Sequence, residues 1–156
     1  MDELLLCPMT RQLCHAFFRD YENDPALFQD VSQYRPYVYT PEEADRFFDS
    51  KQRPDRQEMV VMMGGHPIGH VQIKNIDLEK RECELGATMQ NDSYKGKGYG
   101  TRIVKLALQY AFDTLGMNAV WADTVLTNTR SQHVLEKVGF RYIREDGTFK
   151  YYCYEK

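Results

Sequence analysis

A glycine-rich stretch in the middle of the chain constrains the fold more than any other feature. Residues 94–101 read Tyr-Lys-Gly-Lys-Gly-Tyr-Gly-Thr, with three glycines at alternate positions. Glycine lacks a Cβ atom, so this loop can turn tightly and let a ligand approach the backbone. The apolar residues that follow recur at three- and four-residue spacings and predict a helix packed on a core: Ile103, Val104, Ala107, Leu108, Ala111 and Leu115.

A short strand is expected directly before this loop, at residues 84–89. A strand–loop–helix unit brings free N–H groups and the positive end of the helix dipole together, which favours a phosphate or pyrophosphate. Two known phosphate-binding motifs are not present. The Walker A motif requires Ser or Thr after Gly-Lys, and here neither follows it. The dinucleotide-binding motif requires a third glycine where this chain has Thr101. From these residues alone, a plain turn between strand and helix remains the alternative.

Length and composition indicate one globular domain over residues 1–156. A chain of 156 residues can bury one substantial core, and no internal repeat or long linker divides it. The net charge of −3 gives no general attraction to nucleic acid or to an anionic membrane. No apolar run approaches the roughly 20 residues that span a bilayer. We therefore expect neither a nucleic-acid partner nor a membrane partner.

The four cysteines, Cys7, Cys14, Cys83 and Cys153, show no paired spacing. Zinc ligation and a disulfide framework are therefore not expected, and we predict reduced thiols and no metal site. The N-terminal residues lack the basic flank and the length of a secretory signal. A cytoplasmic protein is the expectation.

Apolar periodicity and turn residues predict the remaining elements. Thr10 is a candidate cap for a helix through about Tyr21, and the sequence Thr40-Pro41-Glu42-Glu43 predicts a helix to about Lys51. Residues 26–39 are aromatic but aperiodic, which indicates a loop with one helical turn. The other expected elements are strands at residues 3–7 (ended by Pro8), 58–63, 67–76, 118–125, 140–144 and 149–154, a hairpin turn at residues 64–65, and a helix at residues 129–137. This order favours an α/β fold: a mixed sheet with helices on its faces.

A second notable block of sequence runs from Asn128-Thr129-Arg130-Ser131 to residues 135–140 (Leu-Glu-Lys-Val-Gly-Phe). Together with residues 84–86 and 94–101, it resembles the Gcn5-related N-acetyltransferase (GNAT) family. The particular likeness is to the branch of ribosomal-protein N-terminal and spermidine acetyltransferases. It covers residues 58–145 closely and the N-terminal third only in outline.

The resemblance implies a single-domain, largely antiparallel sheet, splayed between the strands at residues 84–89 and 118–125, with helices on both faces. It implies acetyl-CoA as cosubstrate and direct attack by a primary amine in a ternary complex. The acceptor would be a small-molecule amine, a polyamine or a protein N-terminus. A homodimer is compatible with it.

The same resemblance assigns the cofactor contacts. The pyrophosphate would lie on the N–H groups of the loop, from residues Gly96, Gly98, Gly100 and Thr101. Lys95 and Lys97 would add charge, with plain solubility of an exposed loop as the alternative. A main-chain N–H near Met89 would polarise the thioester carbonyl. Asn128 would bond the pantetheine amides, cap the following helix, or do both.

Two residues are candidates for the chemistry itself. Glu84 could accept the amine proton through water, because an alkylammonium has a pKa near ~10.4. An ion pair of Glu84 with Lys80 or Arg81 is the alternative, and His70 and His133 are weaker candidates for the base. Leu135 occupies the place where many relatives carry a thiolate-protonating Tyr. Ser131 corresponds to a Ser that the ribosomal-protein branch offers instead, and its high pKa favours positioning of the pantetheine arm over acid catalysis.

The acceptor is expected against the N-terminal third. Its aromatic residues could form either a satellite core or an aromatic-walled acceptor cleft: Phe17, Phe18, Phe28, Tyr34, Tyr37 and Tyr39. In the second case, Asp20, Glu22, Asp24 and Asp30 would favour a cationic amine.

We therefore predict an acetyl-CoA-dependent N-acetyltransferase. A non-catalytic acyl-CoA sensor is the alternative, supported by Leu135 alone. A nucleotide-binding switch is disfavoured by the absent Walker pattern. A covalent acyl-enzyme is not expected, although Cys83 precedes Glu84 and could point to the other face of its strand.

Overall fold

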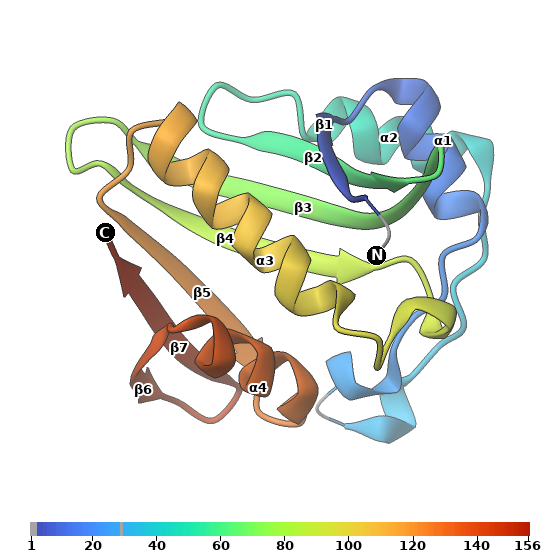
Figure 1. The fold of residues 1–156 in the computed structure, drawn as a ribbon. Helices are drawn as coiled ribbons and strands as arrows, with labels where there is room; N and C mark the ends of the chain where they lie inside the picture. Colours follow the sequence, from blue (N-terminus) through green and yellow to red (C-terminus); the bar gives the residue numbers. More distant parts are fainter. Residues whose placement is uncertain (1–2, 29) are drawn as a thin grey trace.

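In a computed structural model that describes residues 3–28 and 30–156, seven strands form one sheet of order β1-β2-β3-β4-β5-β7-β6 (Figure 1). Neighbouring strands are antiparallel except β4 and β5, which are parallel. The predicted mixed, largely antiparallel sheet is therefore confirmed. The strands are β1 (Leu5–Pro8), β2 (Gln57–Met63), β3 (His66–Asp77), β4 (Glu82–Met89), β5 (Ala119–Val125), β6 (Arg141–Glu145) and β7 (Phe149–Glu155).

The sheet opens between β4 and β5. Their pairing joins residues 82–84 to residues 119–121, and the last pair is Glu84 with Trp121. β4 continues to Met89 and β5 to Val125, and in the described chain these continuations do not pair with each other. The predicted splay is confirmed, and Figure 1 shows the two strands diverging.

Helices cover both faces of the sheet (Figure 1). α1 (Arg11–Arg19) and α2 (Pro41–Ser50) lie on one face, against β1–β3. α3 (Tyr99–Gln109) and α4 (Thr129–Val138) lie on the other. The main core lies between α3 and the sheet, and the stripe predicted from the sequence supplies Ile103, Val104, Ala107, Leu108 and Ala111 to it.

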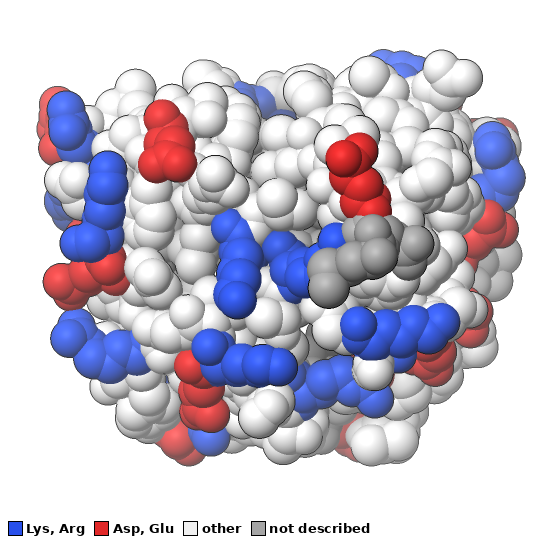
Figure 2. All heavy atoms as spheres, viewed as in Figure 1, with Lys and Arg blue, Asp and Glu red and all other residues white. Residues whose placement is uncertain are grey.

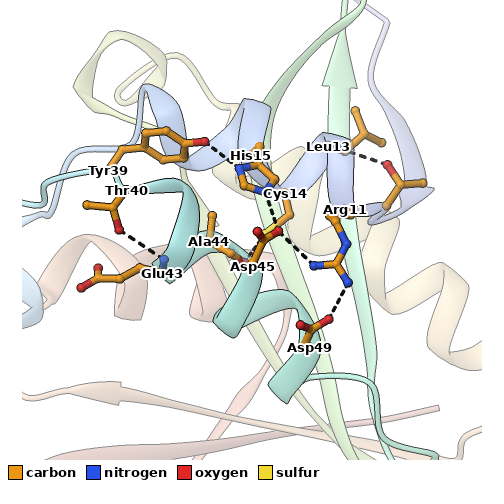
Figure 3. Close-up of polar contacts among 11 residues, drawn as sticks. Arg11, Leu13, Cys14, His15, Tyr39, Thr40, Glu43, Ala44, Asp45 and Asp49 are labelled. Carbon is orange, nitrogen blue, oxygen red and sulfur yellow. Dashed lines mark hydrogen bonds and ion pairs between the residues drawn. The ribbon is translucent and has the colours of Figure 1, made fainter.

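Threonine side chains cap α1 and α2, and other polar side chains join the two helices (Figure 3). Thr10 Oγ1 accepts a hydrogen bond from the N–H of Leu13, and Thr40 Oγ1 accepts one from Glu43, which confirms both predicted helix starts. Between the helices, the ring of His15 lies 2.6 Å from Tyr39 Oη and 2.8 Å from Asp45 Oδ1. The end of the long connection that precedes α2 is thereby held against α1.

Several boundaries differ from those expected. α1 ends at Arg19 rather than Tyr21, and Pro8 belongs to β1, because an edge strand can accept a residue without an N–H. The loop at residues 26–39 carries two 3₁₀ turns, 25–27 and 31–33, where one helical turn was expected.

α3 begins at Tyr99, so Gly100 and Thr101 belong to its first turn and not to the loop. A short 3₁₀ turn, Asp92–Tyr94, precedes the glycines. α3 runs directly into a π-helical segment, Tyr110–Thr114, which apolar periodicity cannot distinguish from an α-helix. No helix of the described residues is long and apolar enough to cross a bilayer.

Candidate active site

A cavity of about 320 Å³ lies where β4 and β5 part. Residues 85–89 line it from β4, and residues 122–125 line it from β5. The N-terminal segment contributes Tyr21, Glu22 and Asp24, and the helices contribute Gly100, Ile103, Val104, Ser131, Val134 and Leu135. The open part of the sheet is therefore a slot walled by both halves of the molecule.

The slot is lined from both faces of the sheet. Leu85 and Ala122 are buried in the core beneath α3. Because successive side chains of a strand point to opposite faces, Gly86, Thr88 and Asp123 lie on the α1/α2 face. All five residues line the cavity. The slot therefore offers a separate approach on each face.

The backbone of β4 presents unpaired N–H groups to the slot. Gln90 donates its N–H to Ile68 O of β3 at 2.8 Å. Alternate residues of a strand direct their N–H groups to opposite neighbours, so the N–H groups of Met89 and Ala87 point toward β5. β5 has already diverged at this level. These donors can bond a ligand carbonyl or amide, and the role expected of Met89 stays a prediction.

The glycine loop leaves open space in front of α3. Gly96 and Gly98 have φ angles of +73° and +81°, and a Cβ at either would meet no atom within 4 Å. Gly98 is the N-cap of α3 and provides no side chain to bond the first N–H groups of the helix. Figure 2 shows Lys and Arg side chains gathered on the face that carries α3 and α4. This geometry fits a pyrophosphate.

The two loop lysines differ in environment. Lys97 is exposed. Lys95 lines the cavity, but its Nζ lies 2.7 Å from Asp24 Oδ2 and 3.0 Å from Asp92 Oδ1. Burial opposes ionisation of Asp24, yet hydrogen bonds from Lys95 and from the N–H of Ala26 lower its pKa below the ordinary value. Lys95 therefore joins the N-terminal segment to the glycine loop.

The second sequence block reaches the slot through α4. Asn128 Oδ1 accepts a hydrogen bond from the N–H of Ser131 at 3.1 Å, so Asn128 is the helix N-cap that was one of its two expected roles. Both side chains line the cavity, and the cap leaves the Asn128 amide nitrogen to donate elsewhere. Leu135 is buried and also lines the cavity, where it offers no hydrogen bond.

Glu84 lies below the slot and not in it. It pairs with Trp121 in the closed part of the sheet and with Lys74 on β3, and it is absent from the cavity lining. Asp123, two residues beyond Trp121 on β5, does line the cavity. Desolvation raises the pKa of Asp123, as do the charges of Glu84 and Asp146, while Lys74 opposes them.

Sequence reasoning missed Asp123. The available signal was a charged residue within an otherwise apolar strand, between the buried Ala122 and Thr124.

The histidine and cysteine alternatives fall outside the site. His70 is buried, with Nε2 3.2 Å from Glu58 Oε1 and its ring against Phe17, Phe18 and Phe47. His133 is exposed on α4 and does not line the cavity. Cys83 is buried on the α3 face, and burial raises the pKa of its thiol to about 11. This thiol is therefore a poor nucleophile.

The aromatic residues of the N-terminal third mainly form a satellite core. Phe17 is buried, and Phe18 packs against Tyr37 and Phe47 of α2. The aromatic side chain from this region that lines the cavity is Tyr21. Of the acidic candidates, Glu22 and Asp24 line the cavity, Asp20 is exposed outside it, and Asp30 accepts hydrogen bonds from the backbone and side chain of Ser32.

Comparison with known proteins decides the family. The model of the acetyltransferase (GNAT) domain matches residues 3–141. The chain belongs to the GNAT family. GNAT acetyltransferases use acetyl-CoA, so this protein is an acetyl-CoA-dependent acetyltransferase. Among the described residues, no group of three or more His, Cys, Asp or Glu could hold a metal ion.

Individual GNAT relatives are distant. The uncharacterized N-acetyltransferase YoaA of Bacillus subtilis (strain 168) is 21% identical, over 99% of this chain and 86% of its own length. The spermidine N(1)-acetyltransferase of Escherichia coli (strain K12) is 28% identical, over 67% of this chain and 56% of its own. Spermidine N-acetyltransferase from Vibrio cholerae, solved in complex with CoA and spermine, superposes with a TM-score of 0.72 and 17% identity, over 97% of this chain and 95% of that one. The structural likeness shows the GNAT fold alone.

Proposed function

We propose that this enzyme transfers the acetyl group of acetyl-CoA to a primary amine by direct attack in a ternary complex. One observation carries the proposal: the slot between β4 and β5 is lined from both faces of the sheet. Acetyl-CoA on the α3/α4 face and an amine on the α1/α2 face would meet where the strands part. No covalent acyl-enzyme is needed.

The α3/α4 face supplies the proposed cofactor contacts. The N–H groups at Gly96, Gly98, Gly100 and Thr101 hold the pyrophosphate at the start of α3, and Lys97 adds charge. Lys95 contributes positive charge without binding the pyrophosphate directly, because Asp24 and Asp92 already bind its ammonium. Asn128 and Ser131 bond the pantetheine arm, and the N–H of Met89 polarises the thioester carbonyl.

Transfer requires the amine to lose a proton, since an alkylammonium has a pKa near ~10.4. Glu84, at the closed end of the slot, supplies negative charge on the acceptor face and influences proton loss only through the groups that line the slot. On the leaving side, Leu135 provides no acid. Ser131 positions the pantetheine, and water protonates the thiolate.

Release of CoA is the direct test. Purified protein and acetyl-CoA are mixed with polyamines, aminoglycosides or N-terminal peptides, and free thiol is measured over time. Polyamines come first, because a curated relative is a spermidine acetyltransferase. A sensor would bind acetyl-CoA and release no thiol with any amine, and the acetyltransferase relatives do not favour it.

A homodimer through β6 is the proposed assembly. β6 is an edge strand of the sheet, and Tyr142, Ile143 and Phe149 expose apolar surface on it and on its neighbour β7. Two copies of β6 could pair edge to edge and cover this surface. Sedimentation of the wild type beside Ile143→Lys tests it: the proposal requires a dimer that the substitution dissociates.

A further inference from the structure

Asp123 is a carboxylate in the slot that no group of the protein binds. Within residues 3–28 and 30–156, no hydrogen bond or ion pair holds it, although it lines the cavity. Glu22 also lines the cavity and is exposed, whereas two other acidic groups near the slot are engaged. Asp24 is bound by Lys95, and Asp146 accepts hydrogen bonds from Thr148, Phe149 and Tyr151. The carboxylate of Asp123 is therefore available to a ligand.

Its position places Asp123 on the acceptor side. Val120 and Ala122 are buried beneath α3, so alternation along β5 directs Asp123 to the α1/α2 face, as it does Gly86 on β4. A Cβ built on Gly86 would have only Gln72 within 4 Å, at 3.8 Å and 3.9 Å. At Gly86 the wall of β4 on this face is thus bare backbone, with room for a ligand between the strands.

Charged groups on β3, on β4 and in the turn between β6 and β7 act on Asp123. Lys74 lies on β3, Glu84 on β4, and Asp146 in the turn between β6 and β7. Tyr151 of β7 pairs directly with Asp123, and Arg144 Cζ lies 4.0 Å from the centroid of the Tyr151 ring. Desolvation and the two carboxylates raise the pKa of Asp123 against the effect of Lys74. A higher pKa makes a carboxylate a better proton acceptor.

We propose that Asp123 binds the ammonium group of the acceptor and takes its proton, with Glu84 acting through Asp123 as a positioning residue. This inference rests on the proposed N-acetyltransferase function. The acceptor is a primary alkylamine, because Tyr21, Val125 and Phe149 give the cavity apolar walls for a carbon chain.

The protons and electrons balance without a further reactant. One ammonium proton moves to a carboxylate oxygen of Asp123. The freed nitrogen lone pair attacks the thioester carbonyl carbon, so that a C–N bond forms. The C–S bond then breaks, and its electron pair leaves on the CoA sulfur. A second proton from nitrogen reaches the thiolate through water, and Asp123 returns its proton to solvent.

The kinetic test compares Asp123→Asn, Glu84→Gln and a matched control, Glu82→Gln, which lies on the same face of β4 in its paired part. kcat/KM for the best alkylamine is measured against pH. Asp123→Asn should lower kcat/KM roughly 10²–10⁴-fold at neutral pH and recover as pH approaches the pKa of the amine. Glu84→Gln should keep most activity. It should move the acidic limb of the kcat/KM–pH profile to lower pH, because a charge that raises the pKa of Asp123 is removed. Glu82→Gln should match the wild type.

A binding test does not depend on transfer. The carboxyl signal of Asp123 is followed by ¹³C NMR during pH titration of the CoA-loaded protein, with and without n-butylamine. Bound ammonium should lower the pKa of Asp123. A pKa unmoved by n-butylamine, or an acidic limb retained in Asp123→Asn, would overturn the assignment. A wild type inactive with every amine would instead refute the transfer function, while the titration still decides whether Asp123 binds ammonium.

Discussion

The ammonium of Lys95 lies 2.7 Å from the carboxylate of Asp24, a residue 71 positions earlier in the chain. The pair ties the segment that borders the acceptor side to the loop that precedes α3. Two further bonds hold the same segment: Thr127 Oγ1 donates to Ala26 O, and Asn91 Nδ2 donates to Asp20 O. Residues from both walls of the slot thus fix the N-terminal segment across its mouth.

Replacing Lys95 should loosen this attachment. Its side chain is 12% exposed, so Lys95→Met removes the ammonium partner of the partly buried Asp24 and should cost about 1–2 kcal/mol of unfolding free energy. The KM for the amine should rise as the acceptor wall moves. Denaturant unfolding measures the first effect, with Lys97→Met on the exposed neighbour as the control. Equal stabilities of the two variants would contradict the structural role.

The open space at Gly98 predicts a selective loss of cofactor binding. Gly98→Ala places a methyl group where the pyrophosphate is proposed to lie, and the Kd for CoA should rise at least about tenfold, or about 1.4 kcal/mol. Gly116→Ala is the matched control, because Gly116 has a φ of +73° beyond the other end of the same helical stretch and equally open surroundings. Both variants should lose stability through backbone strain, which scanning calorimetry measures. Only Gly98→Ala should bind CoA more weakly, which titration calorimetry measures.

Ser131→Ala separates positioning from acid catalysis. The cap of α4 uses the backbone N–H of Ser131 and not its hydroxyl, so the variant should keep the fold. If the hydroxyl only positions pantetheine, kcat should fall by a factor of several. A loss of roughly 10²–10⁴ with unchanged CoA affinity would identify Ser131 as the acid that protonates the thiolate.

Asp146 gives the fold a defined dependence on pH. The N–H groups of Phe149 and Thr148 and the hydroxyl of Tyr151 lower the pKa of Asp146 from 3.8 to about 2. A pKa lowered by folding means that the ionised group stabilises the protein above its unfolded pKa and that this contribution is lost as pH falls toward 2. Asp146→Asn should therefore lower the Tm at neutral pH, and the difference should vanish near pH 2. A difference that persists in acid would point to packing instead of charge.

The local elements could be predicted from the sequence because short-range physics specifies them. Thr is favoured at a helix N-cap because its hydroxyl can accept a hydrogen bond from the N–H three residues later, so Thr10 and Thr40 marked the starts of α1 and α2. Likewise, the apolar spacing of α3 leaves one face of the helix that can be buried in the core. The position of the splay came from the resemblance to GNAT proteins.

The function of individual carboxylates depended on the tertiary structure. Alternation along β4 places Glu84 on the α1/α2 face. Whether Glu84 reaches the slot depends on where the pairing between β4 and β5 stops. That point is set by pairs of residues 37 positions apart in sequence, such as Glu84 and Trp121, and no local pattern encodes it. The same holds for Lys95. From the sequence its charge was expected to act on a phosphate, but in the folded protein its ammonium lies beside Asp24. The sequence by itself determined the family, the elements and the cofactor loop, because these depend on neighbouring residues. Only the tertiary structure decided that Asp123 lines the slot and Glu84 does not, because that depends on contacts between residues distant in sequence.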